Sequence, residues 1–70
     1  MMEEGIVTFW RDARGYGFIR RDGKPDIFIH YSDVSGKWRP DLGDKVAFDI
    51  EADARGRLRA VNVQLIYRYD

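Results

Sequence analysis

Apolar and polar residues alternate along most of this chain, and turn-forming residues interrupt the alternation at short intervals. Alternation with a period of two places successive side chains on opposite faces, as in a β-strand with one buried face. Glycine, proline and aspartate cluster between the alternating runs, for example at residues 22–25 and 43–44, which is typical of turns. The pattern predicts strands at about residues 5–11, 15–21, 26–31, 45–52 and 57–66, and no helix of useful length.

Five short strands in 70 residues are too few for a two-sheet sandwich of ordinary size. Closing them into a small barrel removes the exposed strand edges and buries one face of every strand. The first three strands form a meander with short turns, and a longer connection at residues 32–44 leads to the fourth. We therefore expect an all-β, five-stranded antiparallel OB-fold β-barrel that occupies residues 1–70 as a single domain. Its expected core residues are Val7, Ile19, Ile27, Ile29, Val46, Phe48, Ile50, Val61 and Val63.

Two of the expected strands carry planar rings on one face and branched aliphatic side chains on the other. In the second strand Tyr16 and Phe18 share a face, and in the third strand Phe28 and His30 do so. The intervening isoleucines lie on the opposite faces and are suited to a core. A cluster of rings next to Arg14 is suited to stacking flat ligands, and nucleobases are the commonest of these because every base has a π-face.

Some of these residues have a structural interpretation as well. Gly15 and Gly17 lack Cβ atoms, so they either leave room for a base against the rings or mark a bulge or a close strand approach. A lone histidine is more often structural than functional. His30 is in register with Phe28, however, which favours stacking.

The charges balance, with 12 basic and 12 acidic side chains and a formal net charge of zero. This balance argues against strong non-specific electrostatic capture of nucleic acid, although the local distribution of charge decides. Nine of the basic residues are arginine, whose planar guanidinium stacks on rings and pairs with phosphate. If the chain binds nucleic acid, we expect its rings to contribute more than its charges.

Cysteine is absent and histidine occurs once, which excludes disulfides and argues against a structural zinc site. With no nucleophile placed beside a base, the sequence offers little for catalysis. We therefore expect neither an enzyme with a small-molecule substrate nor a bound cofactor or metal. The chain contains no long apolar run and no signal peptide, so a cytoplasmic protein without a membrane-spanning segment is expected.

Four runs of this sequence resemble motifs of the cold-shock domain family. Gly15–Ile19 (GYGFI) is similar to the first ribonucleoprotein motif of that family, and Asp26–Ser32 (DIFIHYS) is similar to the second. Gly5–Trp10 resembles the family's first strand, and Gly43–Phe48 resembles its fourth. The resemblance covers nearly the whole chain, and the two ribonucleoprotein motifs in this order and at this spacing are specific.

The resemblance implies binding of single-stranded RNA or DNA on an open face of the barrel. Members of the family typically act as RNA chaperones. Residues that match the family pattern would stack bases, contact the nucleic-acid backbone, or hydrogen-bond a base edge. These are, respectively, the rings Phe9, Tyr16, Phe18, Phe28, His30, Tyr31 and Trp38, the arginine Arg14, and the carboxylate Asp26. Arg55 matches a basic loop residue at the far end of the binding face.

The chain departs from the family pattern in its first strand, where Thr8, Phe9 and Trp10 replace the usual order of Lys, Trp and Phe. Strict alternation puts Phe9 on the face of Val7 and Trp10 on the opposite face. A bulge would change this, so either ring is a candidate for stacking. Trp38 likewise has two interpretations, since it either extends the ring face or covers the open end of the barrel.

The leading functional hypothesis is a single-strand binder with little sequence preference, which covers roughly six or seven nucleotides and acts as an RNA chaperone or a cold or stress regulator. The alternative is a protein-interaction module that uses the same aromatic face. Residues 37–40 and 56–61 resemble a variant domain that is fused to a membrane segment, so the chain is either a free protein or the soluble domain of a membrane protein. A monomer is expected, and self-association to a dimer would favour the interaction module.

Overall fold

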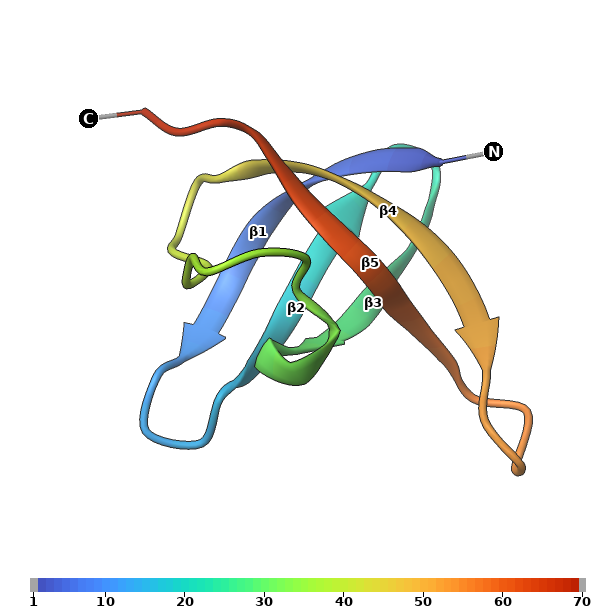
Figure 1. The fold of residues 1–70 in the computed structure, drawn as a ribbon. Coiled ribbons are helices and arrows are strands. Elements are labelled where there is room, and N and C mark those ends of the chain that lie inside the picture. Colours follow the sequence, from blue (N-terminus) through green and yellow to red (C-terminus); the bar gives the residue numbers. More distant parts are fainter. Residues whose placement is uncertain (1, 70) are drawn as a thin grey trace.

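The computed structural model describes residues 2–69, and its five strands close into a small barrel (Figure 1). Around the barrel the strands follow the order β1, β2, β3, β5 and β4, and β4 pairs with β1. Neighbouring strands are antiparallel except β3 and β5, which meet in parallel where Phe28 pairs with Arg59. This closed barrel confirms the predicted all-β fold class. The strands are β1 (Glu3–Arg11), β2 (Tyr16–Arg21), β3 (Lys24–His30), β4 (Lys45–Ala52) and β5 (Leu58–Tyr67).

Each predicted strand is present, and β4 has the predicted bounds. β1 begins two residues earlier than expected, because Glu3 already pairs with Phe48 of β4. β3 ends at His30 rather than at residue 31, because Tyr31–Asp33 forms a short 3-10 helix, η1, that the alternation did not predict. Within residues 2–69, no helix is long and apolar enough to span a membrane.

The barrel interior is built from the inward faces of all five strands. Every residue predicted for the core is buried except Ile50, which is only partly buried and packs against the others. Ile50 lies near the end of β4, where the β4–β5 hairpin extends beyond the other strands (Figure 1). Ala60, which pairs with Ile50, is fully buried and was missed by the sequence analysis. Removing these apolar side chains from water is the main contribution to stability.

A bulge in β1 decides which of its two large rings faces outward. Between Val7 and Phe9 the register with β2 shifts, so Thr8 is an extra residue in β1. The bulge leaves 43% of Phe9 exposed on the outer face, and it turns Trp10 inward to pack against the core. The expectation from strict alternation is therefore wrong, and Phe9 is the first-strand ring on the outer face.

A second irregularity lies in β5, where the register with β4 shifts opposite Ala47 and Asp49. Asn62 adopts a left-handed backbone conformation there, with φ of 51°, and its Nδ2 donates to Oδ2 of Asp49 at 3.2 Å. Asparagine tolerates this conformation better than most residues. Alternation is interrupted at this point, so the neighbours Ala60 and Val61 are both buried.

Candidate nucleic-acid interface

Four aromatic rings lie together on the outer face of β1, β2 and β3, and we call Phe9, Tyr16, Phe18 and Phe28 the ring platform. In the contacting pairs the ring centroids are between 5.9 and 6.4 Å apart. Tyr16 and Phe28 are stacked at an interplanar angle of 23°, and the other pairs are tilted or edge-on. The rings therefore form one continuous aromatic surface, on the face that the alternation predicted for β2 and β3.

His30 and Tyr31, the histidine–tyrosine pair, extend this surface at the end of β3. His30 is opposite Tyr16 in the strand register, and its ring centroid lies 4.8 Å from that of Tyr31. The backbone N–H of Ser32 donates to Nδ1 of His30 at 3.2 Å, and the hydroxyl oxygen of Ser32 lies 2.9 Å from the same nitrogen. The pair thus adds two ring faces at the end of β3, and contacts with Ser32 hold the His30 ring in place.

The glycines beside the platform are required by packing within the protein. A Cβ atom on Gly17 would overlap the carbonyl oxygen of Phe9 and lie 2.8 Å from Cε3 of Trp10. Gly15 has φ of 71°, and a Cβ there would lie 2.5 Å from Cδ1 of Tyr31. For Gly17 the interpretation as a close strand approach is therefore correct. The idea that its missing Cβ makes room for a base is wrong.

Trp38 lies in the connection between η1 and β4, half-buried against the core. Its Nε1 donates to the backbone oxygen of Ser35 at 2.8 Å. Among the described residues, its ring forms no aromatic pair with the ring platform. Trp38 thus covers part of the barrel, and its contact with nucleic acid stays a prediction.

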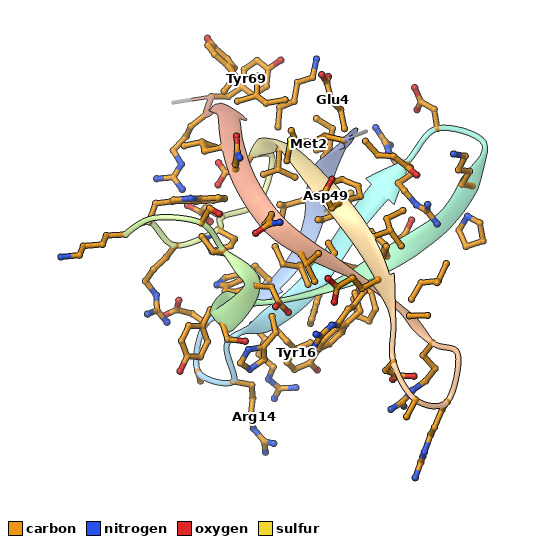
Figure 2. All side chains as sticks on the ribbon, turned by 45° about the vertical axis from the view of Figure 1, so that its right-hand side comes forward. Met2, Glu4, Arg14, Tyr16, Asp49 and Tyr69 are labelled. Atoms are coloured by element: carbon orange, nitrogen blue, oxygen red, sulfur yellow. The ribbon has the colours of Figure 1, made fainter. Side chains whose placement is uncertain are left out.

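The polar residues assigned to nucleic acid lie around the edge of the ring platform. Arg14 is in the β1–β2 loop, on the same side of the barrel as Tyr16 (Figure 2). Asp26 is exposed on β3 and lines a cavity of about 450 Å³ next to two platform rings. Arg55 is exposed in the β4–β5 loop. The interface therefore has cations at two separate places and a carboxylate between the platform and the β4–β5 hairpin.

The same cavity includes residues that the sequence analysis left unassigned. Leu58 is 50% exposed and adds an apolar wall, and Arg57 lines the cavity while its Nε donates to Asp53 at 3.0 Å. The backbone N–H of Arg57, followed by that of Arg55, lowers the pKa of the Asp53 carboxyl below its usual value. In the sequence, the indication of this apolar wall was Leu58, which follows closely after the turn at Gly56.

Three of the basic side chains around the interface are paired with carboxylates. The pairs are Arg39–Asp12 at 3.0 Å, Arg57–Asp53 at 3.0 Å and Arg59–Glu51 at 3.6 Å. In the part of the chain that the structure describes, the side chains of Arg14 and Arg55 form no ion pair, and neither do Arg11, which is opposite Tyr16 in the strand register, and Lys37. The ion pairs therefore reduce the number of cations near the interface that are available for phosphate groups.

Asp12 links the β1–β2 loop to the connection before β4. Its Oδ1 accepts hydrogen bonds from Nε of Arg39 at 3.0 Å and from Nε1 of Trp10 at 3.3 Å. The hydrogen bond from Arg39, then that from Trp10 and the charge of Arg39, lower the pKa of the Asp12 carboxyl below its usual 3.8.

A depressed carboxyl pKa means that the folded state is stabilised while the group is ionised. We expect the Asp12 link to be fully present above pH 3.8 and to be lost as the pH falls through the lowered pKa. An NMR titration of the carboxyl carbon measures this pKa, which Arg39→Gln should raise toward 3.8. A midpoint that is the same in both proteins would contradict the assigned cause.

Fold and site together define a small OB-fold barrel with an exposed ring platform on three adjacent strands. The family model described as 'Cold-shock' DNA-binding domain matches residues 3–66. The cold shock protein CspC of Bacillus subtilis (strain 168) is 43% identical over 65 residues, covering 90% of this chain and 97% of that one. A cold shock-like protein of Aquifex aeolicus (strain VF5) is 38% identical over 69 residues, covering 94% and 97%. The solved structure of drosophila Unr CSD456 has a TM-score of 0.79 and 25% identity, covering 96% of this chain and 27% of that chain.

The chain belongs to the cold-shock DNA-binding domain family, because the family match extends over nearly all of it. The structural match confirms the OB-fold that the sequence predicted. Membership of the family supports a general nucleic-acid-binding role for this protein.

Proposed function

We propose that this protein binds single-stranded RNA or DNA with little sequence preference, by stacking bases on the ring platform and the histidine–tyrosine pair. The observation that carries the proposal is the ring platform, because each of its four rings contacts at least two of the others on the outer face of the barrel. An exposed apolar patch on a soluble protein usually marks a binding site. Stacking one base on an aromatic side chain is worth about 1–3 kcal/mol and tolerates any base.

The residues around the rings have distinct parts in this proposal. Arg14 and Arg55 contact phosphate groups at two ends of a bound strand, which spans roughly six or seven nucleotides. Asp26 accepts a hydrogen bond from a base edge in the adjoining cavity, since an ionised carboxylate only accepts. Trp38 adds a further ring beyond the histidine–tyrosine pair.

In the cell, this binding would make the protein an RNA chaperone or a regulator of the response to cold or another stress. A protein that binds unpaired strands stabilises them by mass action, so base-paired structure shifts toward the open form. Low sequence preference suits that role, because any melted segment is then a ligand. Relatives of this chain are named cold shock proteins, which supports a role in the response to cold.

A fluorescence titration with oligo(dT) of about seven nucleotides tests the proposal directly. Trp10 packs against the backbone of Gly17 between two platform strands, so we expect tryptophan emission to change on binding. An unchanged emission at tens of micromolar oligonucleotide, with no binding by a second method, would refute single-strand binding. Concentration-dependent self-association of such a non-binding protein would favour the interaction module.

The same titration at several salt concentrations measures how many phosphates the protein neutralises. The net charge is zero and three of the cations near the interface are paired with carboxylates, so we expect the affinity to fall slowly with salt. The slope should correspond to fewer than about four phosphate contacts. A steeper slope would show that charge, rather than ring stacking, dominates the affinity.

A further inference from the structure

Arg68 lies beyond the residues 3–66 that match the family, and it ties the chain after β5 to the connection before β4. Its Nε donates to Oδ1 of Asp44 at 2.9 Å, and its Nη2 donates to Oδ2 of the same carboxylate at 2.8 Å. Nη2 also donates to the backbone oxygen of Arg39 at 2.7 Å. One guanidinium therefore holds both ends of residues 39–44, which lie beside the C-terminal segment (Figure 1).

The Asp44 carboxylate needs this partner, because only 1% of the residue is exposed. Its Oδ2 accepts the backbone N–H of Asp41 at 2.9 Å, and its own backbone oxygen accepts the N–H of Val7 at 2.9 Å. An ionised carboxylate in such surroundings is costly unless a cation pairs with it. Removing the guanidinium of Arg68 would leave a buried charge and loosen the connection at both attachment points.

Arg39 connects this anchor to the nucleic-acid interface. Its carbonyl accepts from Arg68, while its side chain donates to Asp12 at 3.0 Å and lies 6.0 Å from the ring centroid of Tyr31. Trp38 directly precedes it in the chain. The placement of the Arg39 guanidinium beside Tyr31 therefore depends on a backbone position that Arg68 holds.

We propose that Arg68 is a positioning residue for nucleic-acid binding, because it fixes residues 39–44 and so holds the Arg39 guanidinium beside Tyr31. This role rests on the proposed function, in which Tyr31 stacks a base. The positioning role predicts that loss of Arg68 weakens nucleic-acid contacts on the Tyr31 side of the interface alone. A general loss of stability would instead act equally on every part of the interface, including Phe18.

A double-mutant cycle distinguishes the positioning role from a general loss of stability. Arg68→Gln should lower the affinity for oligo(dT) about threefold to tenfold, a fraction of what removal of a stacking ring costs. In the Tyr31→Ala background, Arg68→Gln should lower the affinity further by less than about twofold. In the Phe18→Ala background, Arg68→Gln should lower the affinity as much as it does in the unaltered protein. Lys24→Gln removes the same charge at the far end of β3 and should leave the affinity unchanged. Equal losses in the two backgrounds, or no loss at all, would overturn the positioning role.

Asp44→Asn combined with Arg68→Gln separates positioning from stability. The double variant removes the buried charge together with its partner, so its melting temperature should recover much of what Arg68→Gln loses. The affinity should stay lowered, because the carbonyl of Arg39 still lacks its donor. If affinity recovers along with stability, the positioning role is wrong. If the unaltered protein does not bind, the proposed function fails instead, and the amide chemical shifts of residues 38–44 in Arg68→Gln still report whether Arg68 holds the connection.

Discussion

Replacing both Phe18 and Phe28 with alanine is expected to lower the affinity for single-stranded oligonucleotides by at least about thirtyfold. Each ring contributes about 1–3 kcal/mol of stacking, and every 1.4 kcal/mol is a factor of ten. The two rings also contact each other, at 6.0 Å between centroids, so the loss need not equal the sum of the single variants. Fluorescence titration measures the affinity, and circular dichroism checks that the variant is folded.

Tyr69→Ala is the matched control for this prediction. It removes an exposed ring that lies at the opposite end of the molecule from Tyr16 (Figure 2). We expect its affinity to match that of the unaltered protein. A folded double variant of Phe18 and Phe28 that binds as well as Tyr69→Ala would show that the ring platform is not the binding surface.

Gly17→Ala is expected to destabilise the fold by about 3 kcal/mol, the upper part of the range for overpacked cores. The new Cβ would meet the carbonyl oxygen of Phe9, which is backbone and cannot rotate away, and it would crowd the ring of Trp10. For a domain of this size, such a loss is a large fraction of the free energy of unfolding. Chemical denaturation followed by circular dichroism measures it.

Gly56→Ala provides the comparison for that loss. Gly56 also lacks a side chain, but a Cβ there would meet nothing within 4 Å. Its φ of 78° means that alanine costs only the strain of a left-handed backbone, about 1–2 kcal/mol. If Gly17→Ala destabilised the protein no more than Gly56→Ala, the close approach of β1 and β2 at Gly17 would not be the constraint we assign to it.

The parts of the fold that follow from local geometry were predictable. Residues two apart in a strand share a face, so Ile27 and Ile29 were expected in the core and Phe28 was expected outside, as observed. The same rule failed at the β-bulge, where β1 has one residue more than the segment of β2 with which it pairs. Thr8 is an extra residue relative to β2, and this single insertion exchanges the faces of Phe9 and Trp10.

Some features of the candidate site were likewise predictable from the sequence, and others were not. Tyr16, Phe18 and Phe28 were predictable because two neighbouring strands carry them on one face. The tie between Arg68 and Asp44 was not predictable, because it joins residues 24 apart and depends on how a loop folds. Alternation contains no information about such loops, whose conformations are decided by turns, buried charges and the segments packed against them.

The barrel, most of its core and the rings of the interface could be read from the sequence, because strand periodicity and the two ribonucleoprotein motifs are local features. The folded structure was needed to show that Phe9 joins the ring platform while Trp10 packs inward. It was also needed to show that Arg39 lies beside Tyr31 and that Arg68 holds the backbone of Arg39. These arrangements depend on strand register and on contacts between distant segments, which form only when the barrel closes.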